Sequence, residues 1–244
     1  MNGKRAVASQ RAFKSWLIVA AALVLAACTS APPYTPQGTG PAAVAAPPKV
    51  GDYWEYIVRD AYTGASRGHF RFQVSHVDPS NTLIDVFRDG QRVDAYVYAA
   101  DWNPREMPLT NLQRFRYEPP FPAYEFPLEP GKNWYRVVNS TDPATRRTYK
   151  THVQAKVTGW ERVHVPAGEF DALKVVRYVY AGNAEFFNTQ EEIVQTDWFA
   201  PAVNQVVRSE GTSRHIDTSR SGGGRKPLLV RGEWLVAELT RFSR

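Results

Sequence analysis

The feature that most constrains this chain is a period-two alternation of apolar residues, repeated in short runs from residue 50 onwards. Trp54, Tyr56 and Val58 occupy every second position of one run, and the run Phe70–Val74 has the same pattern. Successive side chains of a β-strand point to opposite faces, so such runs are typical of half-buried strands. The sequence therefore predicts β-strands and little helix.

Turn residues separate these runs at spacings that suit hairpins. Asp89-Gly90 lies between two apolar runs, and an Asp-Gly pair is a strong hairpin signal. Pro166-Ala167-Gly168 separates a strand that ends at Val165 from a second strand, because proline presets a turn and glycine completes it. The segment 235–239 could form a short helix instead of a strand. The strands expected around and after these turns are 84–87, 93–97, 153–165, 169–180, 192–199, 205–210 and 233–242.

Short strands at this spacing predict an all-β, antiparallel fold: a curved sheet, a partly closed barrel or a sandwich. Two duplicated β modules, residues 50–121 and 122–244, are possible, because Gly51-x-x-Trp54 and Gly131-x-x-Trp134 both begin a strand. Chance similarity in an aromatic-rich chain is the alternative. The segment 115–130 holds five prolines, which lack the N–H that a strand ladder needs, and we expect it to cross between the halves.

Residues 1–27 have the composition of a secretory signal peptide. Four basic residues precede an apolar stretch of about a dozen residues, which is too short to span a bilayer. The stretch ends in Leu-Ala-Ala-Cys at Cys28, which resembles the lipobox of bacterial lipoproteins. The alternative is a stray thiol behind an uncleaved anchor.

The lipobox resemblance implies cleavage between Ala27 and Cys28 and acylation of Cys28, for example with palmitate. Several acyl chains on one residue hold a protein firmly to a membrane. Thr29 follows the cysteine in place of the Asp that marks inner-membrane retention in many such proteins. The resemblance therefore implies the periplasmic face of the outer membrane of a Gram-negative bacterium.

Residues 28–49 are rich in proline and alanine and carry almost no charge, so we expect a flexible tether. At about 3.1 Å per residue, such a stretch extends up to roughly 60 Å. The β domain of residues 50–244 follows it. With Cys28 acylated, no cysteine remains for a disulfide, and a hydrophobic core must stabilise this domain.

The high pI of 9.4 reflects the signal segment more than the mature protein. Residues 1–27 contain four basic residues and no acidic one, which leaves 26 Lys and Arg against 24 Asp and Glu. A nearly neutral chain lacks the strong basic face that nucleic acids require. We therefore expect no nucleic-acid partner.

Catalytic and metal-binding motifs are not found. The five histidines form no His-Glu-x-x-His pattern, no Gly-x-Ser-x-Gly elbow occurs, and Gly222-Gly223-Gly224-Arg225-Lys226 lacks the spacing of a phosphate-binding loop. We expect no metal, no cofactor and no enzymatic activity. A hydrolase is the less favoured alternative, and it would need a Ser or a carboxylate beside a His in a cleft.

Aromatic residues are the more informative class, at 13% of the chain. They could line a groove for a lipid or another apolar ligand, as in half-barrel lipoprotein carriers, or they could fill a dry core. The core is the favoured interpretation. The candidate lining residues are Trp54, Tyr56, Phe70, Phe72, Trp134, Trp160, Tyr178 and Trp198.

The second half resembles a set of uncharacterised Gram-negative envelope proteins over roughly residues 122–208. Those proteins share the order Phe-Pro-Leu-x-x-Gly-x-x-Trp, Val-Pro-Ala-Gly-x-Phe-x-Ala and Trp-Tyr-x-Pro-x-Val-Gly. Here these patterns begin at Phe126, Val165 and Trp198, with Phe199 for Tyr and Asn204 for Gly. The resemblance implies an exported β domain without an established catalytic role and carries over no functional residue. We expect a lipid-anchored envelope protein with a binding or assembly-accessory role toward an envelope protein or an apolar ligand.

Overall fold

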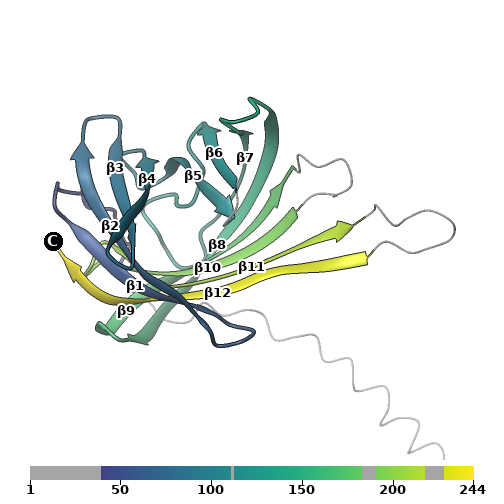
Figure 1. Ribbon diagram of the computed structural model, residues 1–244. Coiled ribbons are helices and arrows are strands. Elements are labelled where there is room, and N and C mark those ends of the chain that lie inside the picture. Colours follow the sequence, from purple (N-terminus) through teal and green to yellow (C-terminus); the bar gives the residue numbers. More distant parts are fainter. Residues whose placement is uncertain (1–39, 111–112, 183–190, 218–227) are drawn as a thin grey trace, which may run out of the picture. The chain divides into compact units, whose positions relative to one another are not determined.

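Antiparallel strands follow one another along the chain and close into a barrel (Figure 1). The structure is a computed structural model that describes residues 40–110, 113–182, 191–217 and 228–244. Within these ranges there are twelve strands: β1 (Tyr53–Asp60), β2 (Ser66–Val77), β3 (Thr82–Arg88), β4 (Gln91–Tyr98), β5 (Pro104–Thr110), β6 (Gln113–Glu118), β7 (Asn133–Thr141), β8 (Thr148–Val165), β9 (Gly168–Ala181), β10 (Glu191–Ala200), β11 (Gln205–Asp217) and β12 (Leu228–Ser243).

Each strand pairs with its neighbours in sequence, and the pairing of β1 with β12 closes the barrel from Tyr53↔Ser243 to Asp60↔Leu235. The all-β prediction is confirmed, and a closed barrel is the form that it takes. The alternative of a short helix over 235–239 is wrong, because this segment belongs to β12 and pairs with both β1 and β11. No helix long and apolar enough to cross a membrane occurs in the described ranges.

The two predicted hairpins are present. Asp89 and Gly90 join β3 to β4, both with positive φ (49° and 84°), as the tight turn of a two-residue hairpin requires. Pro166 and Ala167 join β8 to β9, and Gly168 follows them with φ of 130°. The long β8–β9 pair then forms one side of the barrel.

The proline-rich segment between β6 and β7 covers one end of the barrel. Phe121, Tyr124 and Leu128 are buried in a core cluster together with residues of β7, β8 and β9. The expected crossing segment therefore exists, but it is shorter than 115–130, since residues 115–118 belong to β6. We call this end of the barrel the plugged end.

Residues 40–49, assigned to the tether in the sequence analysis, also pack against the plugged end. Ala43 forms a bridge with Leu128, and Ala46 exchanges hydrogen bonds of 2.8 Å with the side chain of Asn204 in both directions. Glycine and alanine permit this close approach: a Cβ at Gly40 would lie 2.3 Å from the Trp160 indole nitrogen. The boundary expected at residue 49 is thereby corrected; residues 28–39 and the lipobox lie outside the described residues.

The two Gly-x-x-Trp segments have the same local structure. Gly51 and Gly131 both have positive φ (96° and 88°), and each donates its N–H over 2.9 Å to the strand beside it. Trp54 and Trp134 are both buried, and each indole N–H donates over 3.0 Å to a loop carbonyl at the plugged end. The modules 50–121 and 122–244 each contribute six strands to the barrel. Their origin by duplication stays a prediction.

One side of the barrel is held by few ladder pairs. β4 and β5 pair only at Val97↔Glu106 and Tyr98↔Pro104. Beyond these pairs, Arg114 of β6 donates to the Asp94 carboxylate and to the carbonyl of Ala95, and it also donates to Glu106 over 2.8 Å. A side chain thus holds together a stretch of wall that lacks main-chain pairing.

Candidate functional site

The eight aromatic candidates from the sequence do not line one groove. Trp54, Tyr56 and Trp198 belong to one core cluster, with Phe72 packed against it. Trp134 belongs to the other cluster, which Trp160 contacts. Phe70 is half-buried outside both clusters, and Tyr178 is 46% exposed.

Several of these rings contact other aromatic rings directly. Trp54 meets Trp102 edge-on with ring centroids 5.5 Å apart, and Tyr56 meets Phe72 in the same way at 5.8 Å. Such packing is typical of an aromatic core. The Tyr56 hydroxyl also donates to a backbone carbonyl over 2.7 Å, which satisfies it without a ligand. The observed contacts favour the core interpretation for this cluster.

A buried ion pair inside the barrel was not predicted from the sequence. Arg177 of β9 and Asp197 of β10 are joined at 2.5 Å, with side chains only 3% and 4% exposed. Asp197 also accepts hydrogen bonds from Tyr124 and Ser209, both at 2.7 Å. Arg177 donates in addition to the carbonyl of Ala123, so the pair fastens the plug segment to the wall.

A sequence signal for this pair exists in the strand alternation. Arg177 lies between Val175 and Val179, which alternate on the buried face of β9, and Asp197 has the same parity as the buried Ile193. A charged residue in an otherwise apolar inward series indicates a buried partner of opposite charge.

The surroundings of this pair keep Asp197 ionised and Tyr124 protonated. Burial alone would raise the pKa of Asp197, but the Arg177 charge and hydrogen bonds from Ser209, Arg177 and Tyr124 outweigh it and lower this pKa below its ordinary value. Burial, together with the Asp197 charge, raises the pKa of Tyr124. The carboxylate therefore stays ionised and the phenol protonated at neutral pH, which suits a structural role.

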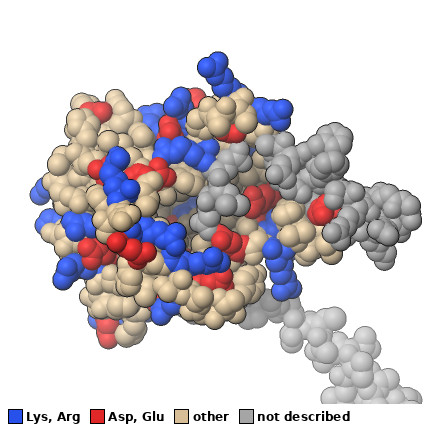
Figure 2. All heavy atoms as spheres, in the orientation of Figure 1, with Lys and Arg blue, Asp and Glu red and all other residues tan. Residues whose placement is uncertain are grey.

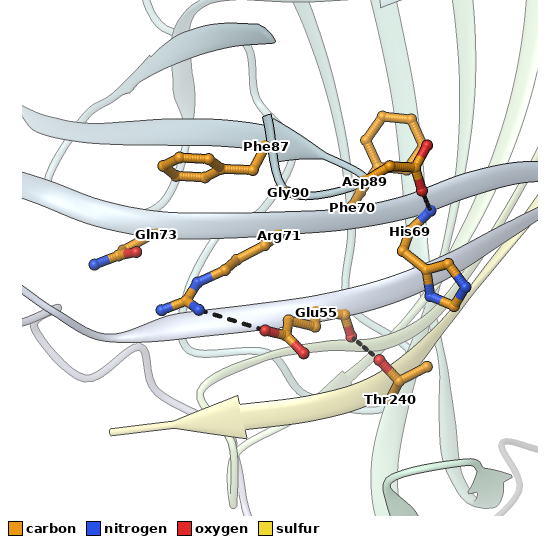
Figure 3. Close-up of a pocket in the computed structure, with 9 residues that line it drawn as sticks. All are labelled: Glu55, His69, Phe70, Arg71, Gln73, Phe87, Asp89, Gly90 and Thr240. Atoms are coloured by element: carbon orange, nitrogen blue, oxygen red, sulfur yellow. Dashed lines mark hydrogen bonds and ion pairs between the residues drawn. The ribbon is translucent and has the colours of Figure 1, made fainter. Parts of the chain in front are cut away.

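A shallow hollow of about 470 Å³ lies on the outer side of β1, β2 and β3 (Figure 3). Figure 3 shows Arg71 and Glu55 pointing toward each other, at a distance of 3.5 Å. The lining residues are Glu55, His69, Phe70, Arg71, Gln73, Phe87, Asp89, Gly90 and Thr240.

Arg71 is the best-positioned polar group of this hollow. Its guanidinium carbon lies 3.9 Å from the centroid of the Tyr53 ring, which fixes the plane of the group. Its Nε is buried without a hydrogen-bond partner in the structure, although the side chain as a whole is 38% exposed. Phe87 contributes an apolar surface beside it. This arrangement combines an oriented cation with aromatic surface, which is a combination common at binding interfaces.

The hollow does not present an oriented catalytic pair. Asp89 accepts from the backbone N–H of His69 over 2.9 Å, so this carboxylate does not orient the imidazole. The Thr240 hydroxyl donates over 3.1 Å to the backbone carbonyl of Glu55. Among the described residues, no three His, Cys, Asp or Glu side chains come together in a way that could hold a metal ion.

Charges of both signs lie side by side elsewhere on the surface. Figure 2 shows Lys and Arg interspersed with Asp and Glu on the face where β1 and β12 run across the front of Figure 1. Arg59 pairs with Glu238 there, and Arg92 of β4 pairs with Asp85 of β3 at 2.8 Å. These exposed pairs contribute little to stability individually.

Comparisons with known proteins give structural similarities only. No model of a known protein family matches this sequence, and a search of curated proteins returns no match. The chain is similar in structure to a putative exported protein with a YmcC-like fold from Bacteroides fragilis, with 15% identity, a TM-score of 0.48, and coverage of 83% of this chain and 100% of that one.

Two further solved structures are similar at the same level. A putative lipoprotein from Parabacteroides distasonis has 15% identity and a TM-score of 0.47, with 84% of this chain and 100% of that chain covered. The hypothetical lipoprotein YmcC from Escherichia coli has 11% identity and a TM-score of 0.40, with 78% and 84% covered. At such identities, no residue role passes from these proteins to this chain.

Proposed function

We propose that this chain is a non-enzymatic, lipid-anchored protein of the bacterial envelope that binds a protein partner through the hollow on β1–β3. The observation that carries the proposal is the oriented guanidinium of Arg71 on the Tyr53 ring, beside Phe87 and within a hollow of about 470 Å³. Arginine and aromatic residues are enriched at the energetic centres of protein interfaces. The anchor is Cys28, which would hold the barrel at the periplasmic face of the outer membrane.

The alternative of an apolar-ligand carrier receives less support. Of the eight candidate lining residues, Trp54, Tyr56, Trp134 and Trp198 are buried in two separate clusters. The Trp198 indole donates to the Glu161 carboxylate over 2.7 Å and has a lysine and an arginine beside its ring. A charged environment of this kind suits an apolar ligand poorly.

Lipidation is tested by replacing Cys28 with alanine. We expect the wild-type chain to incorporate radiolabelled palmitate and to require detergent for extraction from membranes, because several acyl chains bury many methylene groups. Cys28→Ala should incorporate no label and should be released by a high-salt wash. A labelled Cys28→Ala protein would contradict the anchor.

The partner site is tested by placing a photoreactive amino acid at Gln73, which lines the hollow. Irradiation of intact cells should yield a discrete crosslinked protein, and Arg71→Glu should weaken this complex about thirty-fold, as expected for an interface arginine worth about 2 kcal/mol. The affinity is read from the purified pair after the crosslinked protein has been identified.

Arg162→Glu is the matched control, since Arg162 is also an exposed, ion-paired arginine but lies on β8, outside the hollow. It should leave the crosslink unchanged. Equal effects of the two substitutions, or a crosslink to phospholipid alone, would reject the partner site. Thermal unfolding of both variants separates a loss of binding from a loss of fold.

A further inference from the structure

The outer face of β7, β8 and β9 forms a continuous surface distinct from the hollow. Residues alternate along these strands between the buried face and the outer face, and their registers are continuous. Tyr135 pairs with Gln154, and Gln154 pairs with Tyr178. In the next register Val137 pairs with His152, and His152 pairs with Tyr180. We call these two rows the tyrosine face.

The tyrosine face is exposed and aromatic. Tyr135 is 54% exposed, Tyr178 46% and Val137 40%, so three large side chains, two on β7 and one on β9, remain accessible to water. The Tyr135 hydroxyl lies 2.6 Å from Nδ1 of His152, and the two rings are 6.0 Å apart. Amphipathic rings of this kind are typical of positions at a membrane–water interface.

The segments of β7, β8 and β9 that form this face carry basic residues and no acidic one; at its border, Glu192 of β10 pairs in register with Tyr180 and forms an ion pair with Arg214. None of the residues 133–141, 150–157 and 175–181 is Asp or Glu, although these segments lie side by side in the sheet. Lys150 and Lys156 belong to the outward series of β8, and the Lys150 ammonium bonds the neutral side chain of Asn139 over 2.7 Å. This distribution contrasts with the mixed charges over β1 and β12 (Figure 2). The face is complementary to an anionic surface.

We infer that the tyrosine face lies on the surface of the anionic bilayer in which Cys28 is anchored. The inference rests on the lipid anchor of the proposed function, and it assigns to the barrel a second membrane contact. Tyr135 and Tyr178 would sit at the level of the lipid headgroups, while Lys150 and Lys156 would contact phosphate groups. The hollow on β1–β3 belongs to other strands and would stay available to the partner.

The length of chain before the barrel allows this orientation. Gly40 contacts Trp160, and the twelve residues that separate it from Cys28 span at most about 40 Å. Trp160 and Gln154 are six residues apart on β8, a separation of about 20 Å along the strand. The anchor can therefore insert while the tyrosine face contacts the same leaflet.

Single-site fluorescence on the complete lipidated protein tests the inference. Cys28 is the only cysteine, and in the lipidated protein its thiol would carry the diacylglyceryl group, so Gln154→Cys supplies one free thiol on the tyrosine face for an environment-sensitive dye. Val93→Cys is the control, since Val93 is 56% exposed on β4, outside this face. Both proteins are reconstituted into vesicles of phosphatidylethanolamine and phosphatidylglycerol, with pure phosphatidylcholine vesicles for comparison.

We expect brominated lipids to quench the dye at position 154 and not at position 93, in the anionic vesicles only. Added salt should reduce this quenching, because screening weakens exposed charge contacts. Lys150→Gln should shift the equilibrium between the membrane-apposed and free orientations about five-fold toward the free one, the effect of removing one basic residue near such a surface.

Three results would overturn the inference. Equal quenching at positions 154 and 93 would show that no particular face contacts the lipid. A dye at 154 that lipids do not quench but that is protected from aqueous iodide would show that a protein or a second copy covers the face. A dye at 154 accessible to iodide in all vesicles would show that the face is free. Failure of the lipid anchor itself is recognised separately, because the protein would then not incorporate into the vesicles.

Discussion

Replacing Asp197 with alanine is expected to lower the free energy of unfolding by about 3–5 kcal/mol, because it leaves the Arg177 charge buried without its partner. Arg177 is 3% exposed, so water cannot replace the carboxylate. The hydroxyls of Tyr124 and Ser209 would lose their acceptor as well. Urea unfolding followed by circular dichroism measures this change.

A double variant separates the charge from the packing. Replacing Arg177 by methionine and Asp197 by leucine removes both charges from a site that is closed to water. Apolar replacement of a complete buried pair is often neutral or stabilising, so we expect this variant to be more stable than Asp197→Ala. Exposed ion pairs typically contribute less than about 1 kcal/mol. If Asp197→Ala lowered the free energy of unfolding by no more than that, the buried pair would not stabilise the barrel as we infer.

The contribution of Asp197 to the free energy of unfolding falls as the solution becomes acidic. Its pKa in the folded chain lies below its ordinary value of 3.8. The unfolded chain therefore binds more protons in acid, and the stabilisation is fully present above about pH 4 and is lost as the pH falls through the folded pKa. The difference in stability between the wild type and Asp197→Ala should accordingly shrink at acidic pH.

Replacing Trp54 with alanine is expected to cost about 3–5 kcal/mol through the loss of a fully buried ring and the cavity that remains. Trp54 is 0% exposed and packs on Trp102. Its indole N–H bonds the carbonyl of Val203 in the turn between β10 and β11. One side chain thus links β1 to two loops at the plugged end, and the loss should appear in both thermal and urea unfolding.

Two further substitutions calibrate the Trp54 result. Trp54→Phe keeps most of the ring but leaves the Val203 carbonyl without its donor, so an intermediate loss of about 1–3 kcal/mol is expected. Trp234→Ala is the matched control on β12, where the indole bonds Glu210 and the ring is only half-buried. Equal losses for Trp54→Ala and Trp234→Ala would contradict the assignment of Trp54 to the core.

Local features of the fold could be predicted from the sequence, while features that depend on long-range pairing could not. Asp89-Gly90 and the Pro166–Gly168 turn specify their hairpins through residues that are adjacent in the chain. Closure depends on the pairing of β1 with β12, and no local pattern distinguishes a closed barrel from a curved sheet or a sandwich. The segment 235–239 remained ambiguous because short apolar runs suit both helix and strand.

The candidate site was predictable only in part. The inward series of β9 shows that Arg177 is unusual, but its partner Asp197 is identified only when the register of β9 and β10 is known. Arg71, Glu55 and Phe87 come from three strands, and their meeting in the hollow depends on the registers of β1, β2 and β3. The buried state of Trp54 and Trp134 agrees with the core interpretation, whereas Tyr178 is exposed because it alternates with the inward residues Val175, Arg177 and Val179 of β9.

The pairing of the first strand with the last also determines when folding can finish. Tyr53 of β1 pairs with Ser243 of β12, so the first and last strands of the described residues must meet. Such distant contacts make folding slow, because the chain must close a long loop before the contact is formed. Until β12 is available for pairing, β1 and β11 each retain an open edge that can pair with another chain. We therefore expect a chain stopped before Leu228 to be prone to aggregation, even though eleven of its strands are complete.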